Sequence, residues 1–69
     1  MKLWIARDGD GSNSLWLYNA KPDKQPSNIY TCTWKENGEW GEEYELDKDM
    51  FPEITFENSP REVELKLVK

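Results

Sequence analysis

Two segments near the N-terminus of the chain combine aromatic and branched side chains as β-strands do. They are KLWIAR at 2–7 and SLWLYN at 14–19, and the intervening DGDGSN consists of residue types that favour turns. We expect the two segments to form an antiparallel hairpin. Its facing pairs are then Trp4 with Tyr18, Ala6 with Trp16 and Ile5 with Leu17.

A second hairpin is predicted for the middle of the chain. The segments IYTCTWK at 29–35 and WGEEYEL at 40–46 flank ENGE, in which Asn37-Gly38 is typical of a two-residue type I′ turn. The connector before it, AKPDKQPSN at 20–28, contains two prolines and is unsuited to a central strand. The facing pairs expected from this turn are Lys35 with Trp40, Trp34 with Gly41, Thr31 with Tyr44 and Ile29 with Leu46.

The last third of the chain predicts a third hairpin. DKDMF at 47–51 indicates one helical turn capped by Asp47, and EITFE at 53–57 indicates a weak strand. After a short turn, REVELKLV at 61–68 alternates apolar and charged residues, which is typical of a half-buried strand. We expect the last two strands to pair. The side chains that then face the core are Val63, Leu65 and Leu67.

These elements indicate a small all-β fold, with a single domain over residues 1–69. Five to six short strands would form a twisted antiparallel meander or an SH3-like partial barrel. A chain of 69 residues has little interior, and four Trp, three Tyr and two Phe supply the bulk for a core. One Cys excludes an internal disulfide, and the absence of His leaves no zinc site of the usual type.

Charge is distributed unevenly along the chain. Residues 1–35 carry five basic and three acidic side chains, whereas residues 36–69 carry four basic and eleven acidic ones. This balance argues against direct nucleic-acid binding, which depends on Lys and Arg, and favours a well-solvated surface. No apolar stretch is long enough to span a membrane, and the N-terminus lacks a signal-peptide pattern. With a single Cys, we expect a reducing cytoplasm and no membrane partner.

Both ends of the chain resemble one protein family. WIARDGDGSNSLWLY at 4–18 and FPEITFENSPREVELKLV at 51–68 are similar to the opening and closing motifs of small bacterial and phage-borne proteins. Their shared features are a Trp, an Arg-Asp pair and a Gly-bearing turn at the start, and Phe-Pro-Glu followed by an alternating Val-Glu-Leu strand at the end. The resemblance is weak across 20–46. It implies a self-contained all-β domain and assigns no activity, catalytic residue or ligand.

Three features contain residue types that metal binding or catalysis requires, and each has a simpler structural explanation. Asp8, Asp10 and Ser12 match the first spacings of a calcium loop, but the required Gly and bidentate Glu do not follow, so turn chemistry explains them. Cys32 lies within a strand, where it is expected to be a small buried hydrophobe. Neighbouring carboxylates in a strand point to opposite faces. We therefore expect no enzyme activity and no metal or cofactor.

The aromatic side chains Trp4, Trp16 and Tyr18 share one face of the first hairpin and are the candidate partner-binding residues. Aromatic stripes in small folds usually belong to the core. An exposed stripe, however, can bind a Pro-rich or extended peptide. The leading hypothesis is a non-enzymatic protein-interaction module of bacterial or phage origin. It would use this face or a free sheet edge to bind a protein partner or a second copy.

The alternative hypothesis is an acidic inhibitor that mimics nucleic-acid phosphates and binds a basic DNA-binding protein. The side chains that would supply its charge are Glu42, Glu43, Glu45, Asp47, Asp49, Glu62 and Glu64. Salt distinguishes the two hypotheses, because exposed charges are screened beyond about 10 Å at 0.1 M salt. The affinity of a mimic should fall steeply as salt rises, and an aromatic contact should change little.

Overall fold

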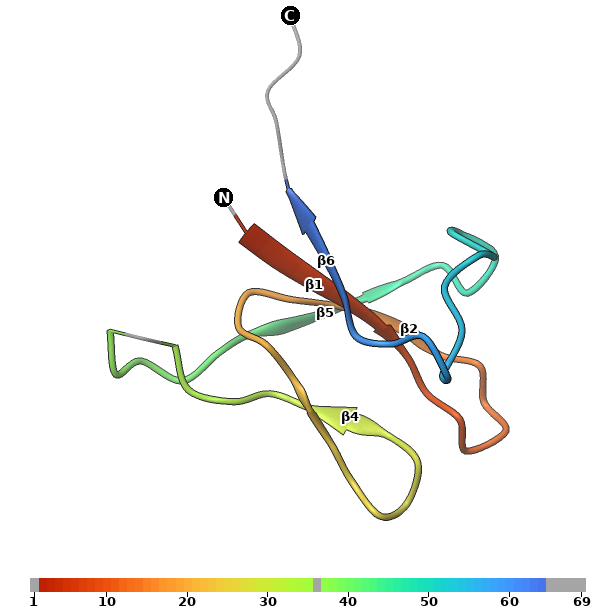
Figure 1. Ribbon diagram of the computed structural model, residues 1–69, viewed down its shortest axis with the longest axis horizontal. Helices are drawn as coiled ribbons and strands as arrows, with labels where there is room; N and C mark the ends of the chain where they lie inside the picture. The colour runs from red at the N-terminus through yellow and green to blue at the C-terminus, as the bar shows by residue number, and fades with distance from the viewer. Residues whose placement is uncertain (1, 36, 65–69) are drawn as a thin grey trace, which may run out of the picture.

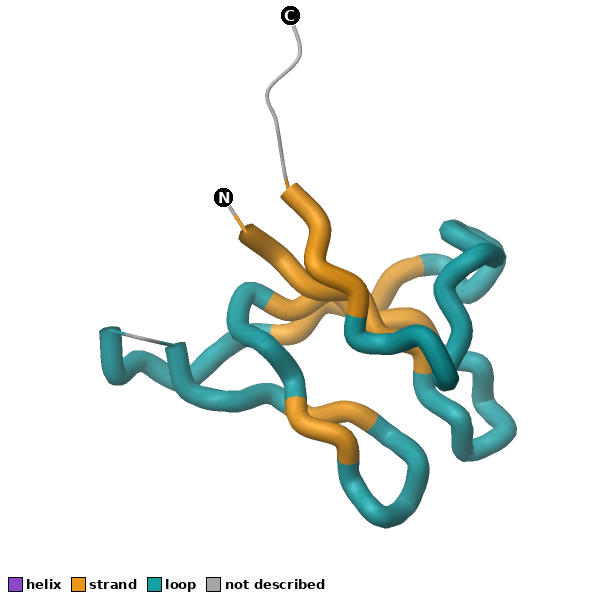
Figure 2. Tube along the Cα trace, in the orientation of Figure 1, coloured by secondary structure: helices purple, strands orange, loops and turns teal. Residues whose placement is uncertain are grey.

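Six short strands make up two antiparallel sheets in the computed structural model, which describes residues 2–35 and 37–64 (Figures 1 and 2). The described residues contain no helix, so the all-β prediction is confirmed. The larger sheet has the order β5-β2-β1-β6, and β3 pairs with β4 in the smaller one. The strands are β1 (Lys2–Arg7), β2 (Leu15–Tyr18), β3 (Asp23–Lys24), β4 (Tyr30–Thr31), β5 (Glu43–Leu46) and β6 (Arg61–Glu64).

The hairpin of β1 and β2 forms in the predicted register. Trp4 faces Tyr18, and Ile5 faces Leu17. Both faces of this hairpin are apolar, so both need a cover. Other parts of the chain pack against each face of the larger sheet, of which β1 and β2 form the centre.

The predicted second hairpin forms only at its tip. The amide of Lys35 donates to the carbonyl oxygen of Glu39 at 2.8 Å, and Trp34 bridges to Trp40. Three residues, not two, separate Lys35 from Glu39, and Gly38 has φ +84°, as a three-residue loop requires. The predicted register is therefore wrong by one residue.

The two arms of that hairpin then separate into different sheets. β4 pairs with β3, while β5 pairs with β2, where Leu46 faces Leu15. The predicted pairs Thr31 with Tyr44 and Ile29 with Leu46 are thus wrong. The exchange has a physical reason, because pairing with β2 lets Leu46 pack against a buried cluster that the predicted hairpin would not have reached.

The third predicted hairpin is also wrong. Residues 53–57 form turns and bends, and β6 pairs with β1, where Val63 faces Leu3. This pairing covers the second edge of β1, and Val63 packs against the core as predicted. The segment 47–51 forms one hydrogen-bonded turn, capped as expected by Asp47, whose side chain accepts from the Asp49 amide. Leu65 and Leu67 lie outside the described residues.

The core consists of two clusters on opposite faces of the larger sheet. On the aromatic face, the cluster is Ala6, Tyr18 and Tyr30, with Trp4, Trp16, Cys32 and Phe56 packed against it. On the aliphatic face, it is Ile5, Leu15 and Ile54, with Leu17, Leu46 and Val63 packed against it. Tyr30 belongs to β4, so the smaller sheet covers the aromatic face. Among the described residues, the aliphatic face has only the 47–55 segment as its cover.

Candidate functional site

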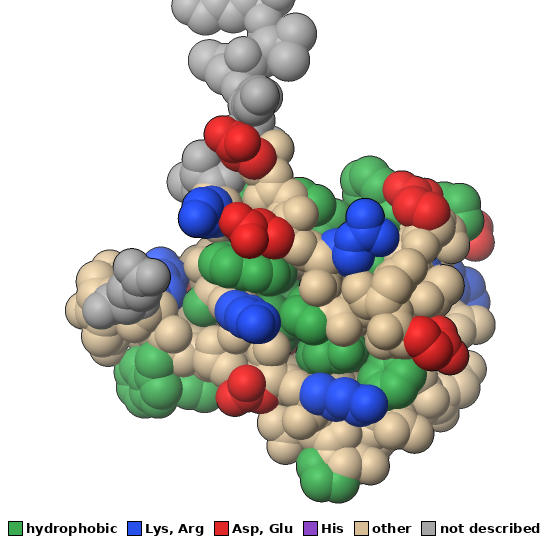
Figure 3. Space-filling view, viewed as in Figure 1, with side chains coloured by type: hydrophobic (Ala, Val, Ile, Leu, Met, Phe, Trp, Pro, Cys, Tyr) green, Lys and Arg blue, Asp and Glu red, His purple; other side chains and the backbone are tan. Residues whose placement is uncertain are grey.

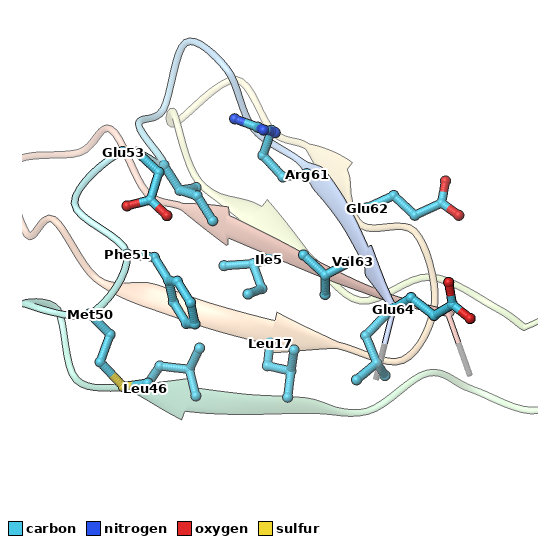
Figure 4. Close-up of a pocket in the computed structure, with 12 residues that line it drawn as sticks. Ile5, Leu17, Leu46, Met50, Phe51, Glu53, Arg61, Glu62, Val63 and Glu64 are labelled. Atoms are coloured by element: carbon cyan, nitrogen blue, oxygen red, sulfur yellow. The ribbon is translucent and has the colours of Figure 1, made fainter. Parts of the chain in front are cut away.

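A groove lies on the aliphatic face, where the 47–55 segment covers the sheet only in part (Figure 4). Its volume is about 460 Å³. The floor is apolar and comes from all four strands of the larger sheet: Leu3, Ile5, Leu17, Leu46 and Val63. The wall comes from the 47–55 segment: Met50, Phe51 and Ile54. We call this site the apolar groove.

Two wall residues expose much of their apolar surface. Met50 is 43% exposed and Phe51 is 40% exposed. In Figure 4 the Phe51 ring stands over the sheet and faces Val63 across Ile5. Phe51 has φ +48°, in the left-handed region that glycine and asparagine favour and bulky side chains avoid. The backbone at the wall of the groove is therefore strained at the residue whose ring is presented to solvent.

Arg7 fixes the position of this wall. Its guanidinium is buried on the aliphatic side of β1, and it donates five hydrogen bonds to backbone carbonyl oxygens. The shortest runs from Nε to the Ile54 carbonyl at 2.6 Å. Nη2 reaches the carbonyls of Met50 at 3.1 Å and Phe51 at 3.3 Å. One side chain from the sheet thus holds the segment that carries the exposed apolar residues.

Charged side chains surround the apolar groove without filling it. Glu53 and Arg61 lie at its rim, and the carboxylates of Glu62 and Glu64 point away from it beyond β6 (Figure 4). The register explains this direction, because Glu62 faces Trp4 and therefore belongs to the aromatic side of the sheet. Three of these four charged side chains are acidic.

The structure brings the predicted aromatic residues together on one face, inside the core cluster. Tyr18 is fully buried, and its hydroxyl donates to the carbonyl oxygen of Tyr30 at 3.1 Å. Burial raises the pKa of the Tyr18 hydroxyl above its ordinary value. Trp4 and Trp16 are half-buried and pack against the same cluster. These rings form packing contacts with the aromatic cluster, and Trp4 also lines a second groove of about 570 Å³ together with Trp34.

The seven acidic residues of the alternative hypothesis are divided between the two edges of the larger sheet and a turn. Glu42, Glu43 and Glu45 lie at or next to β5, and Glu62 and Glu64 lie on β6, at the opposite edge of the sheet. Asp47 and Asp49 lie in the turn after β5. Figure 3 shows acidic and basic side chains interspersed on the visible face of the molecule. These acids lie close together in the second half of the sequence, but the strand order places them at opposite edges of the sheet.

The loop between β1 and β2 uses its acidic side chains for structure. The Asp8 carboxylate accepts from the Tyr30 amide at 3.1 Å, which ties β4 to the end of β1. Burial raises the pKa of the Asp8 carboxyl, and the Tyr30 hydrogen bond opposes this shift. Asp10 accepts from the amide and hydroxyl of Ser12 within its own turn. Within the described residues, no group of three potential ligands gathers to hold a metal ion.

Cys32 packs half-buried against the aromatic cluster, as a small apolar side chain would. Burial raises the pKa of its thiol, and the nearby Glu43 adds to this shift. A raised pKa keeps the thiol protonated and weakens it as a nucleophile.

Two features of the surface were missed by the sequence interpretation. The first is the apolar groove, for which the signals were the two apolar faces of the first hairpin and the apolar pair Met50-Phe51 within an acidic stretch. The second is the pair of Trp34 and Trp40 at the tip of the central hairpin. They are 65% and 54% exposed, and their rings meet edge to face with centroids 4.8 Å apart.

Comparison with known proteins finds no match to this chain among protein-family models, curated proteins or solved structures. The family resemblance of the two chain ends therefore stays a prediction. Over residues 2–35 and 37–64, no helix is long and apolar enough to cross a membrane.

Proposed function

We propose that this protein is a non-enzymatic protein-interaction module and that the apolar groove is its contact surface. The observation that supports the proposal best is the conformation of Phe51. A bulky residue at positive φ costs on the order of 1–3 kcal/mol. The ring held there remains 40% exposed, so this chain gains only part of the burial that such a ring can provide. A partner seated in the apolar groove would bury the rest.

The surroundings of Phe51 support the same proposal. Met50 lies beside it with 43% of its surface exposed, and Met is a side chain that adapts to varied apolar partners. The floor beneath them is already formed and apolar, as a pre-organised binding site requires. A reducing cytoplasm is the compartment we expect for this activity, because the chain carries one cysteine.

The rim favours binding over catalysis. The carboxylates of Glu62 and Glu64 point away from the floor, and the apolar side chains of the floor offer no acid, base or nucleophile. The acidic-mimic hypothesis receives less support, because its charges lie on two opposite edges of the sheet.

The experiment is a selection of displayed peptides against the folded protein, followed by affinity measurements on two variants. Phe51→Asp removes the exposed ring but keeps a residue that tolerates positive φ. Trp40→Asp is the matched control, since it makes the same kind of change at an exposed aromatic outside the apolar groove. We expect the selected peptides to lose at least about tenfold in affinity for Phe51→Asp, the equivalent of about 1.4 kcal/mol.

The same peptides should bind Trp40→Asp as they bind the wild type. Amide chemical shifts should change at Leu17, Leu46, Met50 and Val63 when peptide is added. Equal affinity for Phe51→Asp and the wild type, or shift changes confined to another surface, would overturn the proposal.

A further inference from the structure

We infer that the partner of the apolar groove is an extended segment that alternates apolar and basic residues and adds to the sheet along the free edge of β6. This inference rests on the proposed function and specifies the chemistry of the partner. It follows from three properties of β6, namely its position in the sheet, its two different faces and its charge.

The first property is position. β6 pairs with β1 on one side, and it ends the order of the larger sheet, so its outer edge has no strand partner among the described residues. The amides and carbonyls of such an edge can bond to an added strand. Val63 of this strand lines the apolar groove, so an added strand would also lie beside that site.

The second property is the difference between the two faces. Side chains of an added strand continue the faces of β6, one to each side in alternation. On the aliphatic side they would lie beside Val63, where apolar residues extend the covered surface. Arg61 is on that same side and disfavours a basic residue there. On the other side they would lie beside Glu64 and beside Glu62, whose carboxylate already pairs with Lys2 of β1 at 3.7 Å; Lys or Arg would form cross-strand ion pairs there.

The third property is charge, which disfavours a second copy of this chain as the occupant. The outer edges of the larger sheet carry Glu62 and Glu64 on β6, and Glu43 and Glu45 on β5. Pairing β6 with either edge of another copy would set glutamates beside glutamates on the same face. The net charge of −5 opposes self-association further. The edge therefore favours a partner of opposite charge.

The first test uses short capped peptides and the wild-type protein. One peptide alternates valine and lysine, a second has the same composition in two blocks, and a third alternates valine and glutamate. We expect the alternating basic peptide to bind best. Two cross-strand pairs predict an advantage of roughly two- to thirtyfold over a peptide without them. This advantage should shrink as salt is raised, because the ion pairs are exposed.

A charge-reversed protein provides the matched control. In the double variant Glu62→Lys with Glu64→Lys, both changes lie at exposed positions, so the fold should persist. Its preference should reverse in favour of the valine–glutamate peptide. An unchanged preference for the basic peptide would overturn the inference.

The second test distinguishes strand addition from simple occupation of the apolar groove. Every second amide of an added strand faces β6, so N-methylation of these amides should abolish binding, whereas methylation of the intervening amides should be tolerated. Equal tolerance at all positions, with binding still lost in Phe51→Asp, would overturn strand addition and leave the proposed function standing. Peptide binding that is indifferent to Phe51→Asp would overturn both.

Discussion

Phe51 connects the strain in the backbone to the surface that the protein presents. At this residue a side chain is unfavourable for the backbone, because φ is +48°. We predict that Phe51→Gly is more stable than Phe51→Ala by about 1 kcal/mol, since both lose the ring and only glycine relieves the strain. Urea denaturation of the two variants measures the difference.

The control for this comparison is Tyr44, which is exposed in the regular strand β5. There the order should reverse, with the alanine variant more stable than the glycine variant. The same order at both positions would contradict the assignment of strain to Phe51.

Arg7 is the residue on which the wall of the apolar groove depends. Replacing it by Met removes the donor of four carbonyl oxygens in a partly or fully buried setting, while the Phe51 carbonyl keeps the amide of Ile54. We predict a loss of at least about 3 kcal/mol in the free energy of unfolding for Arg7→Met. Arg61→Met is the control, because Arg61 is exposed on the same side of the sheet and should change stability by no more than about 0.5 kcal/mol. Thermal and urea unfolding measure both, and equal effects would refute the role of Arg7.

Asp8 makes stability depend on pH in a direction that its burial determines. Its pKa in the folded state is raised above the ordinary value of 3.8, so the folded protein binds this proton more tightly than the unfolded chain. The contribution of this proton to the stability of the fold is therefore fully present below pH 3.8, and it is lost as the pH rises through the folded-state pKa of Asp8. Asp8→Asn keeps an oxygen for the Tyr30 amide and removes the titration.

We predict that the wild type gains stability relative to Asp8→Asn as the pH is lowered from 7 toward 4. Urea denaturation measures the free energy of unfolding of both proteins across this range. Subtracting the value of Asp8→Asn from that of the wild type at each pH removes the effects of the other carboxylates. A difference that stays constant, or that changes in the opposite sense, would show that burial does not control this carboxyl.

At the scale of elements, local patterns predicted the turns better than the pairing of strands. The hairpin of β1 and β2 was predictable in full, because its loop is rich in turn residues and both arms stay with each other. The Asn37-Gly38 turn closes near its predicted place, but its arms have a choice of neighbours. Pairing of β5 with β2, and of β6 with β1, depends on which edges remain available, and that is a property of the whole sheet.

The candidate site was less predictable than the fold. Sequence alone indicated two apolar faces on the first hairpin and left the aromatic face open between core and partner-binding surface; in the structure its rings pack against a buried cluster. The 47–55 segment is held in place by Arg7, which was considered from the sequence only as one of the basic residues. Because the Arg7 side chain bonds only to backbone carbonyl oxygens, which every residue has, the sequence gives no indication of its partners.

Gly41 marks the point at which the arms of the central hairpin separate. Its amide donates to the Thr33 carbonyl oxygen at 2.8 Å, and a Cβ built at Gly41 would lie 2.6 Å from that oxygen. We predict that Gly41→Ala destabilises the fold by about 1–3 kcal/mol, because the backbone must shift. At Gly11 a Cβ would meet open space, so Gly11→Ala should lower the free energy of unfolding by only roughly 1 kcal/mol, the cost of a side chain at positive φ. Urea denaturation compares them, and a smaller effect at Gly41 would contradict this close approach.

For the whole molecule, the two faces of the larger sheet have different roles. On the aromatic face Tyr30 of the smaller sheet packs with Ala6 and Tyr18, and a second groove of about 570 Å³ lined by Trp4 and Trp34 lies beside them. The aliphatic face has a partial cover and keeps an open groove beside an edge strand. Within residues 2–35 and 37–64, β5 and β6 have no strand partner on their outer sides, and a small sheet with such edges beside an apolar groove is prone to self-association unless its edges carry charge.

The glutamates of β6 should therefore keep the protein monomeric. We predict that the double variant Glu62→Val with Glu64→Val self-associates at neutral pH, because it removes the repulsion and adds apolar surface beside the free edge. Asp49→Val with Glu57→Val is the matched control, with the same loss of charge at exposed positions outside the strands. Sedimentation velocity over a range of concentrations should give a monomer for the wild type and the control, and a mass that rises with concentration for the edge variant. A monomeric edge variant, or a wild type that already associates, would show that charge on β6 does not control assembly.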